Sequence, residues 1–440
     1  MPWRRPRAEL LLLVLIAAVT LSPVAGYDEQ DSSRICLSRA LVAGRLSNDG
    51  CFAYTVDRSV HGSHLYSNKA PGMSVIEIAP AEAVRLSSPV VWTHTADLRL
   101  WVVHLFASGL PFLLCVFLVG RISEGLAPAY GAPAMVAFGL GTLFAPLAAS
   151  GFDHVLTGTV AFLAFVLSWR RRPFAAGLAA GVAVTIEYEA AVILLIVLAY
   201  TALQGRRAIL RYTVGAVPGI AALLVYDWLA FGAPWHIPVS YTSNYHADVH
   251  SGVLGIHLPN LHNTGLVFIG DRGLIVTSPV VIAAALGLVL LWRRGFRSEA
   301  LTCGAVTAAF LIAECGYFFP YGGGSPGPRY FIPALPFLAL GIAPAFARRP
   351  VAVTLISAVS VFATTAVTLT WSLAAPYRHT IWGAIGRALI RPGTWLHSTV
   401  VSKDVLVWDA GSAAVVVVVG VLAAAAFAVG MRLRLAHFPN

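Results

Sequence analysis

The chain has 440 residues, of which 58% are hydrophobic and 11% are charged, and its mean hydropathy is +0.76. These values exclude a soluble globular protein, which would carry about 25% charged residues, and they indicate an all-α polytopic membrane protein. The formal net charge of +10 does not indicate nucleic-acid binding, because the basic residues mostly separate apolar segments, as they do in membrane proteins.

Apolar segments recur along the chain and predict about twelve transmembrane helices in a single membrane domain, residues 1–440. The predicted spans are Glu9–Gly26, Leu98–Gly120, Gly131–Ser150, Val155–Trp169, Pro173–Glu187, Ala190–Gln204, Tyr212–Phe231, Gly273–Trp292, Leu301–Phe319, Tyr330–Phe346, Val351–Ala374 and Ala410–Gly430. The stretch Pro173–Gln204 must contain two short helices, because arginine-rich flanks at both ends require an even number of crossings. We expect the turn between them at Glu187–Glu189.

The basic residues cluster in alternate short loops, and cytoplasmic loops are the ones enriched in lysine and arginine. The clusters are Arg121, Arg170–Arg172, Arg206–Arg207, Arg293–Arg294, Arg348–Arg349 and Arg432 with Arg434. This bias places both termini in the cytoplasm and the polar segments 27–97, 232–272, 320–329 and 376–409 outside. A cleaved signal peptide ending at Ser22–Gly26 is an alternative for the N-terminus, although its apolar run is long for one.

The first outer segment, residues 27–97, begins with carboxylates directly after an apolar span. Charge beside hydrocarbon is costly, so Asp28 and Glu29 mark a candidate functional site. A carboxylate there could take a proton from an acceptor hydroxyl. A short helix is expected over Ser33–Ala43, with Asp31 or Ser32 as its N-cap and Asp28 too far upstream to cap it.

The same segment contains two of the five cysteines, Cys36 and Cys51. An oxidising compartment permits a disulfide between them, and we predict one. The other three, Cys115, Cys303 and Cys315, lie in apolar spans and are expected to pack there.

A second polar cluster precedes a Pro-Gly turn at Pro71-Gly72, and its basic and hydroxyl side chains suit an oxyanion such as phosphate. Its members are Asp57, Arg58, His61, His64, Tyr66 and Lys69. A solvated surface hairpin is the alternative interpretation of this composition.

Further downstream, a glycine run leads to Arg329, which could hold a lipid phosphate or simply anchor the chain at the membrane interface. The run lacks the Gly-Lys-Ser/Thr ending of a nucleotide-binding loop. Asp153 and His154 occupy a short outer turn, where they either help to bind substrate or form a simple polar turn.

The segment 232–272 holds five histidines, and His246, Asp248 and His250 would share one face if this stretch were extended. A zinc site is one interpretation of that pattern. No cysteine accompanies these histidines, and we expect no metal or other cofactor. Asp227 and Glu314, within predicted spans, are expected to be paired polar groups inside the membrane.

In their order along the chain, these motifs resemble the GT-C membrane glycosyltransferases. The narrower resemblance is to bacterial relatives of the dolichyl-phosphate-mannose–protein mannosyltransferases and of the lipid A aminoarabinose transferase. It rests on the acidic pair Asp28-Glu29, Tyr66–Gly72, Asp227–Pro234, Arg272–Leu274 with Ser278-Pro279, and Gly323–Tyr330 with Pro336, and it extends to about Phe346.

The resemblance implies a catalytic base at Asp28 or Glu29 and a donor-phosphate contact at Lys69. The chain departs from the family pattern at two positions. It has Asn68 where the family has aspartate, and it has Asp227 where the family has asparagine. Lys69, with Arg329 or Arg272, would offset the charge that builds on the leaving phosphate.

We therefore expect an inverting glycosyltransferase that moves a sugar from a polyprenyl-phosphate donor to a hydroxyl of a glycan, lipid or protein acceptor. Its active site would face outward from a bacterial plasma membrane; 28 of the 30 basic residues are arginine, which is typical of a GC-rich bacterial genome. The alternatives are a lipid or sugar transporter or flippase, and a non-catalytic subunit of a cell-envelope assembly. Transporters usually contain paired repeats, which this sequence lacks.

Overall fold

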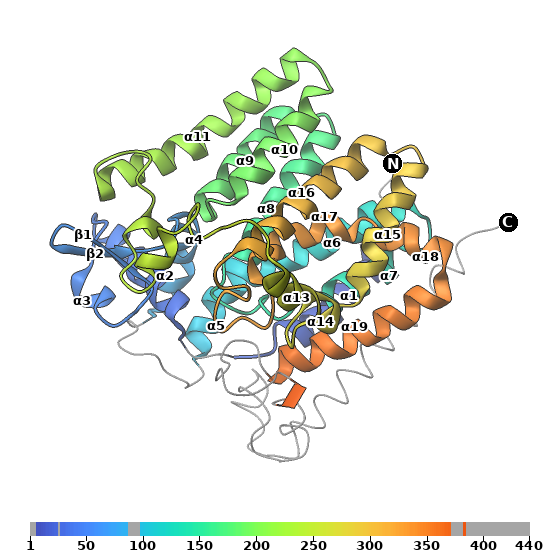
Figure 1. The fold of residues 1–440 in the computed structure, drawn as a ribbon, viewed down its shortest axis with the longest axis horizontal. Helices are drawn as coiled ribbons and strands as arrows, with labels where there is room; N and C mark the ends of the chain where they lie inside the picture. Colours follow the sequence, from blue (N-terminus) through green and yellow to red (C-terminus); the bar gives the residue numbers. More distant parts are fainter. Residues whose placement is uncertain (1–5, 25–26, 87–96, 371–381, 384–440) are drawn as a thin grey trace.

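The computed structural model describes residues 6–24, 27–86, 97–370 and 382–383. The predicted span 410–430 and most of the predicted outer loop 376–409 lie outside these residues. The described chain is a helical bundle with one small hairpin (Figure 1).

The elements in chain order are α1 (Pro6–Thr20), α2 (Glu29–Val42), α3 (Asp49–Phe52), β1 (Arg58–His61), β2 (His64–Ser67), α4 (Gly72–Ala83), α5 (Leu98–His104), η1 (Leu105–Gly109), α6 (Leu110–Leu126), α7 (Gly131–Gly139), α8 (His154–Trp169), α9 (Pro173–Ile186), α10 (Ala190–Ala202), α11 (Arg206–Phe231), η2 (Pro238–Tyr241), α12 (His246–Val249), α13 (Leu261–Ile269), α14 (Leu274–Thr277), α15 (Val280–Arg293), α16 (Arg297–Gly316), η3 (Arg329–Ala334), α17 (Leu335–Ala339), α18 (Ile342–Arg348) and α19 (Pro350–Thr370).

Four helices of the described chain are long and apolar enough to cross a membrane, and six are if each sharply bent helix pair counts as one span. The four are Leu98–Leu126, Arg206–Phe231, Arg297–Gly316 and Pro350–Thr368. Four shorter apolar helices, among them α8, α9 and α10, pack beside them. The protein is therefore a helical membrane protein, and the figure of twelve spans stays a prediction.

The predicted helical hairpin at Pro173–Gln204 is confirmed, with Glu187–Glu189 between α9 and α10. These helices and α11 lie side by side at the top of the view in Figure 1. Helices α9 and α11 approach so closely that a Cβ atom at Gly177 would lie 1.8 Å from the carbonyl oxygen of Tyr212. Small residues permit such close contact between membrane helices, where apolar burial gives little drive for association.

Two predicted spans are interrupted. The apolar segment Gly131–Ser150 is helical only to Gly139, because Gly139, Gly141 and Pro146 disfavour continuation and the following turns are themselves buried in the protein. The segment Gly273–Trp292 is broken at Ser278-Pro279, where the helices on either side meet at 88°. A third, Tyr330–Phe346, bends by 52° between α17 and α18.

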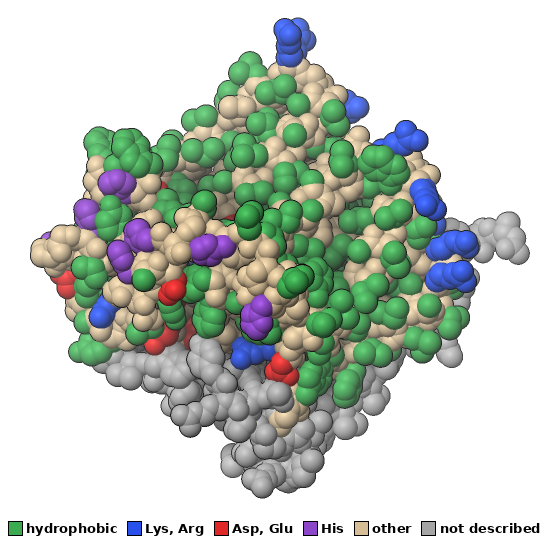
Figure 2. Space-filling view, viewed as in Figure 1, with side chains coloured by type: hydrophobic (Ala, Val, Ile, Leu, Met, Phe, Trp, Pro, Cys, Tyr) green, Lys and Arg blue, Asp and Glu red, His purple; other side chains and the backbone are tan. Residues whose placement is uncertain are grey.

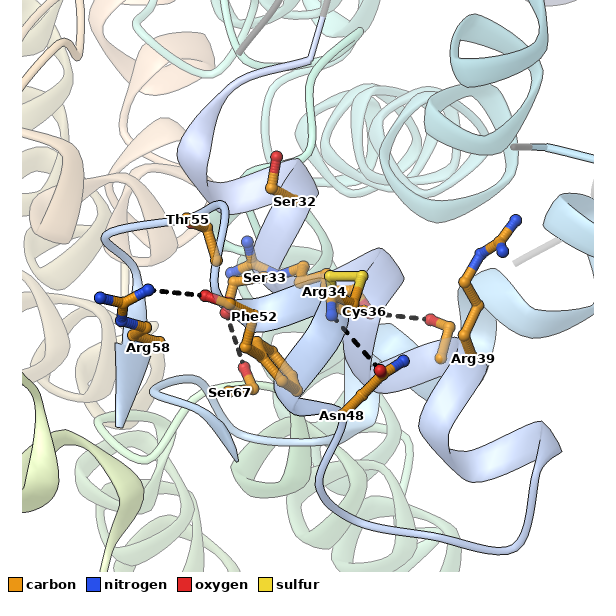
Figure 3. Close-up of a disulfide and its surroundings, with 12 residues drawn as sticks. Ser32, Ser33, Arg34, Cys36, Arg39, Asn48, Phe52, Thr55, Arg58 and Ser67 are labelled. Atoms are coloured by element: carbon orange, nitrogen blue, oxygen red, sulfur yellow. Dashed lines mark hydrogen bonds between the residues drawn. A yellow bond between two sulfur atoms is a disulfide. The ribbon is translucent and has the colours of Figure 1, made fainter. Parts of the chain in front are cut away.

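The first polar segment folds as helices α2, α3 and α4 around the antiparallel hairpin β1–β2, in which Arg58 pairs with Ser67 and His61 with His64. The predicted disulfide is confirmed: Cys36 of α2 and Cys51 of α3 are bonded, with their Cα atoms 5.6 Å apart (Figure 3). A hydrogen bond between the hydroxyls of Ser33 and Ser67 also joins α2 to β2.

The expected N-cap of the first helix in this segment was wrong. Helix α2 begins at Glu29, four residues earlier than expected, and Asp28 is its N-cap. The Asp28 carboxylate accepts a hydrogen bond from the amide of Asp31, and the Asp31 carboxylate accepts one from the amide of Asp28. This reciprocal capping box satisfies two amides at once, which explains why the acidic run Asp28–Asp31 belongs to the helix start.

Basic residues gather at one end of the helical bundle, and histidines and acidic residues gather at the other. Most of the visible lysine and arginine side chains gather along the upper right edge in Figure 2, whereas histidines and acids gather toward the hairpin end. Exposed arginines stand in the turns α8–α9, α10–α11, α15–α16 and α18–α19, and three others, Arg45, Arg85 and Arg99, lie in or beside the first polar segment. The opposite helix ends, including the starts of α2, α8 and α10, surround the candidate site.

Candidate active site

Two cavities of about 220 and 330 Å³ lie at the hairpin end of the bundle and share part of their lining. The first cavity is lined by Asp28, Glu29 and Asp57 together with the loop 317–324. The second is lined by carboxylates at one end and by apolar side chains of α10 and α16. The residues common to both form what we call the shared wall: Gln30, Asn68, Lys69, Val239, Tyr317, Arg329 and Tyr330.

Asp28 is 8% exposed and lines the first cavity while it caps α2. Burial and the neighbouring charge of Asp31 raise the pKa of Asp28 to about 8. Asp31 in turn contacts the ring of His104, whose Nε2 lies 2.7 Å from its carboxylate oxygen. The helix cap thus holds one carboxyl group in a fixed orientation at the cavity, with a proton affinity suited to a general base near neutral pH.

Glu29, the neighbouring acid, is held by a different contact. Its carboxylate accepts hydrogen bonds from the hydroxyl of Thr55 at 2.7 Å and the amide of Val56 at 2.9 Å. These bonds attach the start of α2 to the turn before β1. Glu29 lines the first cavity beside Asp28.

Lys69 stands on the shared wall, where its ammonium group lies 3.1 Å from a carboxylate oxygen of Asp57. Burial disfavours ionisation of Asp57, but the charges of Lys69 and Arg329 outweigh it and hold the pKa of Asp57 below its usual range. Burial lowers the pKa of Lys69, although Asp57 opposes this shift. The pair places one ammonium group between the two cavities.

Arg329, at the start of η3, is the second cation of the shared wall. Its Nη2 donates a hydrogen bond to the hydroxyl of Tyr330, and its guanidinium lies over the rings of Phe152 and Tyr330. Its buried Nε has no hydrogen-bond partner among the described residues. Gly322 packs directly against this Nε, since a Cβ atom there would lie 2.3 Å from it. The glycine run therefore provides space for the arginine.

Asp153 and His154, at the start of α8, line the second cavity together with Glu187. The guanidinium of Arg34, which is fully buried, lies 2.5 Å from one oxygen of Asp153. Burial opposes ionisation of Asp153, yet Arg34 and His154 keep the pKa of its carboxyl below the usual range. Nδ1 of His154 lies 2.6 Å from a Glu187 carboxylate oxygen. Glu189 and Glu314 complete the acidic end of this cavity.

No protein-family model and no curated protein matches the sequence, but solved structures match the fold. ArnT from Cupriavidus metallidurans, a lipid A aminoarabinose transferase, aligns with 96% of this chain and 74% of its own length at a TM-score of 0.51 and 17% identity. The chain has the GT-C fold. An oligosaccharyltransferase from Archaeoglobus fulgidus aligns with 86% of this chain, at a TM-score of 0.50 and 12% identity, and the chain spans 57% of that protein.

Most of the predicted site residues meet at the two cavities, close to the starts of α2 and α8. Asp28, Glu29, Asp57, Lys69 and Arg329 line the first cavity. Lys69 and Arg329 also line the second, with Asp153 and His154. Residues 300 positions apart thus meet because α2, the turn after β2 and the start of η3 reach the same end of the bundle.

Five other predicted site residues line neither of the two cavities found in the described part of the chain. Arg58 donates hydrogen bonds to the carbonyls of Phe52 and Ala53, and His64 contacts Asp49. The rings of His61 and Tyr66 pack against Phe231. These contacts belong to a hairpin that packs on the end of α11.

Arg272, the fifth of them, donates hydrogen bonds to the carbonyls of Gly323 and Ser325 and lies over the ring of Tyr321. It thus supports the loop 321–325, whose glycines 322–324 line the first cavity. A direct contact with donor phosphate stays a prediction for this residue.

The histidine-rich segment is helical where an extended strand was considered. His246 is the first residue of the short helix α12 (His246–Val249) and His250 follows its last residue, and their rings stack with centroids 4.1 Å apart. Asp248 lies two positions from each, and residues two apart on a helix do not face each other. In the described part of the chain, these histidines do not belong to any group of three close metal-ligand side chains.

Three residues that line the second cavity were not predicted as site residues: Glu187, Glu189 and Glu314. Glu187 and Glu189 were assigned only to a turn, although two acids in a turn at the outer membrane face were a usable signal. Asp227 has a polar partner, the hydroxyl of Tyr188 at 2.7 Å. Glu314 differs, since its carboxylate faces the backbone amides of Tyr330 and Phe331 and not a side-chain hydroxyl of the described residues.

Proposed function

We propose that the protein is an inverting glycosyltransferase that moves a sugar from a polyprenyl-phosphate donor to an acceptor hydroxyl at the extracytoplasmic membrane face. The observation that carries the proposal is the shared wall, on which Lys69 and Arg329 stand between two cavities of different character. The first cavity offers carboxylates and opens beside the polar segment α2–α4. The second offers apolar side chains from α10 and α16, such as Val192 and Phe310, which suit a lipid chain. The GT-C fold, which ArnT shares, supports this reaction class.

The donor phosphate would bind at the shared wall. Lys69 supplies a point charge, and Arg329 presents an Nε–H without a hydrogen-bond partner among the described residues. Phosphate oxygens are good acceptors for such charge-assisted hydrogen bonds. Asp57 balances the charge of Lys69 in the absence of ligand. When the sugar–phosphate bond breaks, the two cations offset the extra negative charge on the leaving phosphate.

The acceptor would bind in the first cavity, with its hydroxyl at Asp28. Asp28 takes the hydroxyl proton while the acceptor oxygen forms a bond to the anomeric carbon of the sugar. The bond from that carbon to the phosphate oxygen breaks with its electron pair, which leaves polyprenyl phosphate. Attack from the side opposite to the phosphate inverts the anomeric configuration. Glu29, fixed by Thr55 and Val56, orients the acceptor or shapes the field beside the base.

A reconstituted assay tests this function. The full chain in lipid nanodiscs is incubated with polyprenyl-phosphate mannose or polyprenyl-phosphate arabinose and with envelope glycan or lipid extracts as acceptors. Transfer of labelled sugar from either donor supports the proposal. Translocation of the labelled donor across liposome membranes without sugar transfer would instead identify a flippase. Donor binding with neither transfer nor translocation would identify a non-catalytic subunit. Glycan profiling of a deletion strain would then identify the missing sugar linkage.

A further inference from the structure

His104 and Asp31 form a buried pair behind the N-cap of α2. Nε2 of His104 lies 2.7 Å from Oδ1 of Asp31, and each residue is 1% exposed. The other oxygen of Asp31, Oδ2, accepts the hydrogen bond from the amide of Asp28 at 3.0 Å. One carboxylate thus connects the imidazole ring to the residue proposed as the base.

The turn before α8 encloses this pair. Gly151 lies against it, and a Cβ atom at that position would overlap Oδ1 of Asp31. The π-helical turn η1 begins directly after His104, and the hydroxyl of Ser108 in this turn donates a hydrogen bond to the carbonyl of Ser150 at 2.9 Å. Such π-helical turns are rare and frequently occur at functional sites. The pair is therefore held between α2, the end of α5 and the turn before α8, where it is shielded from water.

The ring of His104 faces hydrogen-bond acceptors within the described chain. One is the carboxylate of Asp31, and another is the backbone carbonyl of Ala149. Neutral imidazole has one N–H group and one acceptor nitrogen, whereas imidazolium has an N–H group on both nitrogens. A buried site lined by acceptors therefore favours imidazolium, and the adjacent carboxylate balances its charge.

Several charged or titratable groups face this helix cap from the surrounding elements, namely Tyr27, Arg34, Asp57, Glu77 and His104. Of these, His104 is the one that makes an ion pair with either carboxylate of the cap within the described chain. Arg34 makes its ion pair with Asp153. Without His104, the neighbouring carboxylates of Asp28 and Asp31 would lack a cation in contact, and their repulsion would favour protonation of one of them.

We propose that His104 is a positioning residue for Asp28, acting through Asp31. As imidazolium it keeps Asp31 ionised, and Asp31 holds the amide of Asp28, so the Asp28 carboxyl keeps its orientation at the first cavity. The positive charge also offsets that of Asp31, so that Asp28 can ionise and take the acceptor proton near neutral pH. This role rests on the proposed function, since it presupposes that Asp28 is the base.

Two substitutions should move the pH profile of sugar transfer in opposite directions. His104→Gln keeps a hydrogen-bond donor to Asp31 but removes the positive charge, so the acid limb of the profile should move to higher pH by about one unit. Asp31→Asn removes the negative charge beside Asp28, so the limb should move to lower pH by a similar amount. The control is His262→Gln, the same chemical change at an exposed position of α13, which should leave the profile unchanged.

A loss of rate in His104→Gln without a shift of the acid limb would overturn the inference, because a merely structural contact leaves the charge at Asp28 unchanged. A shift in the wrong direction in either variant would do the same. If His104→Gln does not fold, the shift in Asp31→Asn decides. If neither folds, nitrogen-15 NMR of the histidine-labelled wild-type chain decides, because one of the 13 histidines must keep both N–H groups at a pH at which exposed histidines are neutral.

Infrared difference titration separates the role of His104 from the proposed function. The carboxyl band that disappears in Asp28→Asn reports the protonation of Asp28 without any substrate. If this band titrates at higher pH in His104→Gln and the wild-type chain transfers no sugar, the proposed function is refuted and the effect of His104 on Asp28 stands. Sugar transfer by a chain whose Asp28 band does not move in His104→Gln would refute the role of His104 alone.

Discussion

Asp28 combines two tasks in one carboxyl group, because it caps α2 and also lines the first cavity. Any substitution that removes its oxygen weakens the helix start as well as the candidate base. An N-cap lost to alanine costs about 1 kcal/mol, whereas asparagine caps about as well as aspartate. Asparagine is thus the substitution that separates the two tasks.

Asp28→Asn should reduce sugar transfer by roughly 100-fold or more, because the amide cannot accept the acceptor's proton. Donor binding and thermal stability should be close to wild type, since the capping bond to the amide of Asp31 is kept. Glu29→Gln should have a smaller effect on the rate. The measurement is the rate of transfer in nanodiscs, with donor binding as the control. Full activity in Asp28→Asn would assign the base to another residue.

The pH dependence of transfer follows from the raised pKa of Asp28, about 8. Below that pH the carboxyl is mostly protonated and cannot act as a base, so the rate should rise about 10-fold per unit between pH 6 and 7 and level off above pH 8. The groups facing Asp28 are Asp31, His104 and Asp57, of which Asp31 raises and His104 lowers its pKa. Asp28→Asn should abolish this limb of the profile. A wild-type rate independent of pH between 6 and 8 would contradict the assignment.

The same shift has a consequence for stability with a definite sign. The folded-state pKa of Asp28 lies above its ordinary value, so the folded protein binds this proton more tightly than the unfolded chain does. The resulting stabilisation is complete below the ordinary pKa and is lost as the pH rises through about 8.

Lys69→Met and Arg329→Met should weaken donor use, because both remove positive charge at the proposed phosphate site. We expect a loss of about 10-fold or more in donor affinity, given that hydrogen bonds to charged groups contribute about 1.5–3 kcal/mol. Lys69→Met also leaves Asp57 without its ion-pair partner, so the double variant Asp57→Asn with Lys69→Met is the folding control. Donor binding by microscale thermophoresis checks this. Normal donor affinity in both single variants would place the phosphate elsewhere.

From the sequence and its family resemblance, Asp28, Lys69 and Arg329 were predicted to share one cavity, and all three line the first cavity. The sequence could not assign the start of α2, since an acidic run offers several caps and only the reciprocal bonds of Asp28 and Asp31 choose among them. Nor could it separate Arg58 and His64, which serve the hairpin, from Asp57, which faces the cavity. Which side a residue of a short strand faces depends on packing against distant elements.

At the scale of elements, the disulfide fixes the segment that presents Asp28. The bond joins α2 to α3, and its cysteines lie 15 residues apart in sequence (Figure 3). Both cysteines belong to a small apolar cluster with Phe52 and Phe231. The bond braces α2 against α3, and the packing of this cluster connects the first polar segment to the end of α11. The bond was predicted because both cysteines lie in one polar segment that is expected on the outer, oxidising face of the membrane.

Replacement of both cysteines by serine should lower the free energy of unfolding of this segment by about 3 kcal/mol, the chain-entropy estimate for a loop of about 15 residues. Transfer should fall at elevated temperature more than at low temperature, because α2 loses order without losing Asp28. Thermal unfolding with and without reductant measures the effect. The double variant Cys115→Ala with Cys303→Ala, which alters buried free thiols, is the control. Equal melting of the serine variant and wild type would contradict a stabilising role.

Helices were predicted correctly where charged residues mark the ends of an apolar segment. They were predicted wrongly where apolar residues are buried inside the protein. The pair α9–α10 was evident from arginines at its outer ends and acids at its turn. Residues 140–150 were taken as part of a span, since they are as apolar as a lipid-facing helix. Their turns are enclosed by other helices, and hydropathy does not distinguish protein from lipid as the surrounding apolar medium.

For the whole molecule, the arginine-rich turns and the candidate site occupy opposite ends of the helices (Figure 2). The sequence-based topology therefore assigns the site to the outside and the turns to the cytoplasm. A cysteine introduced at His64, which is exposed, should react with a membrane-impermeant maleimide in intact cells. One introduced at Arg206 should react only after permeabilisation. The reverse pattern would place the site in the cytoplasm and exclude an outward-facing mechanism.

In the proposed mechanism, the shared wall requires donor and acceptor to be bound at the same time. Donor and acceptor would occupy different cavities and meet only at the bond being exchanged, so both must be present before either product forms. A single displacement of this kind gives intersecting double-reciprocal plots rather than parallel ones. Under this proposal, free polyprenyl phosphate would bind in the second cavity and would compete with the donor but not with the acceptor. The lipid product can then leave sideways into the bilayer while the glycosylated product departs toward the aqueous side, with no obligatory sequence of release.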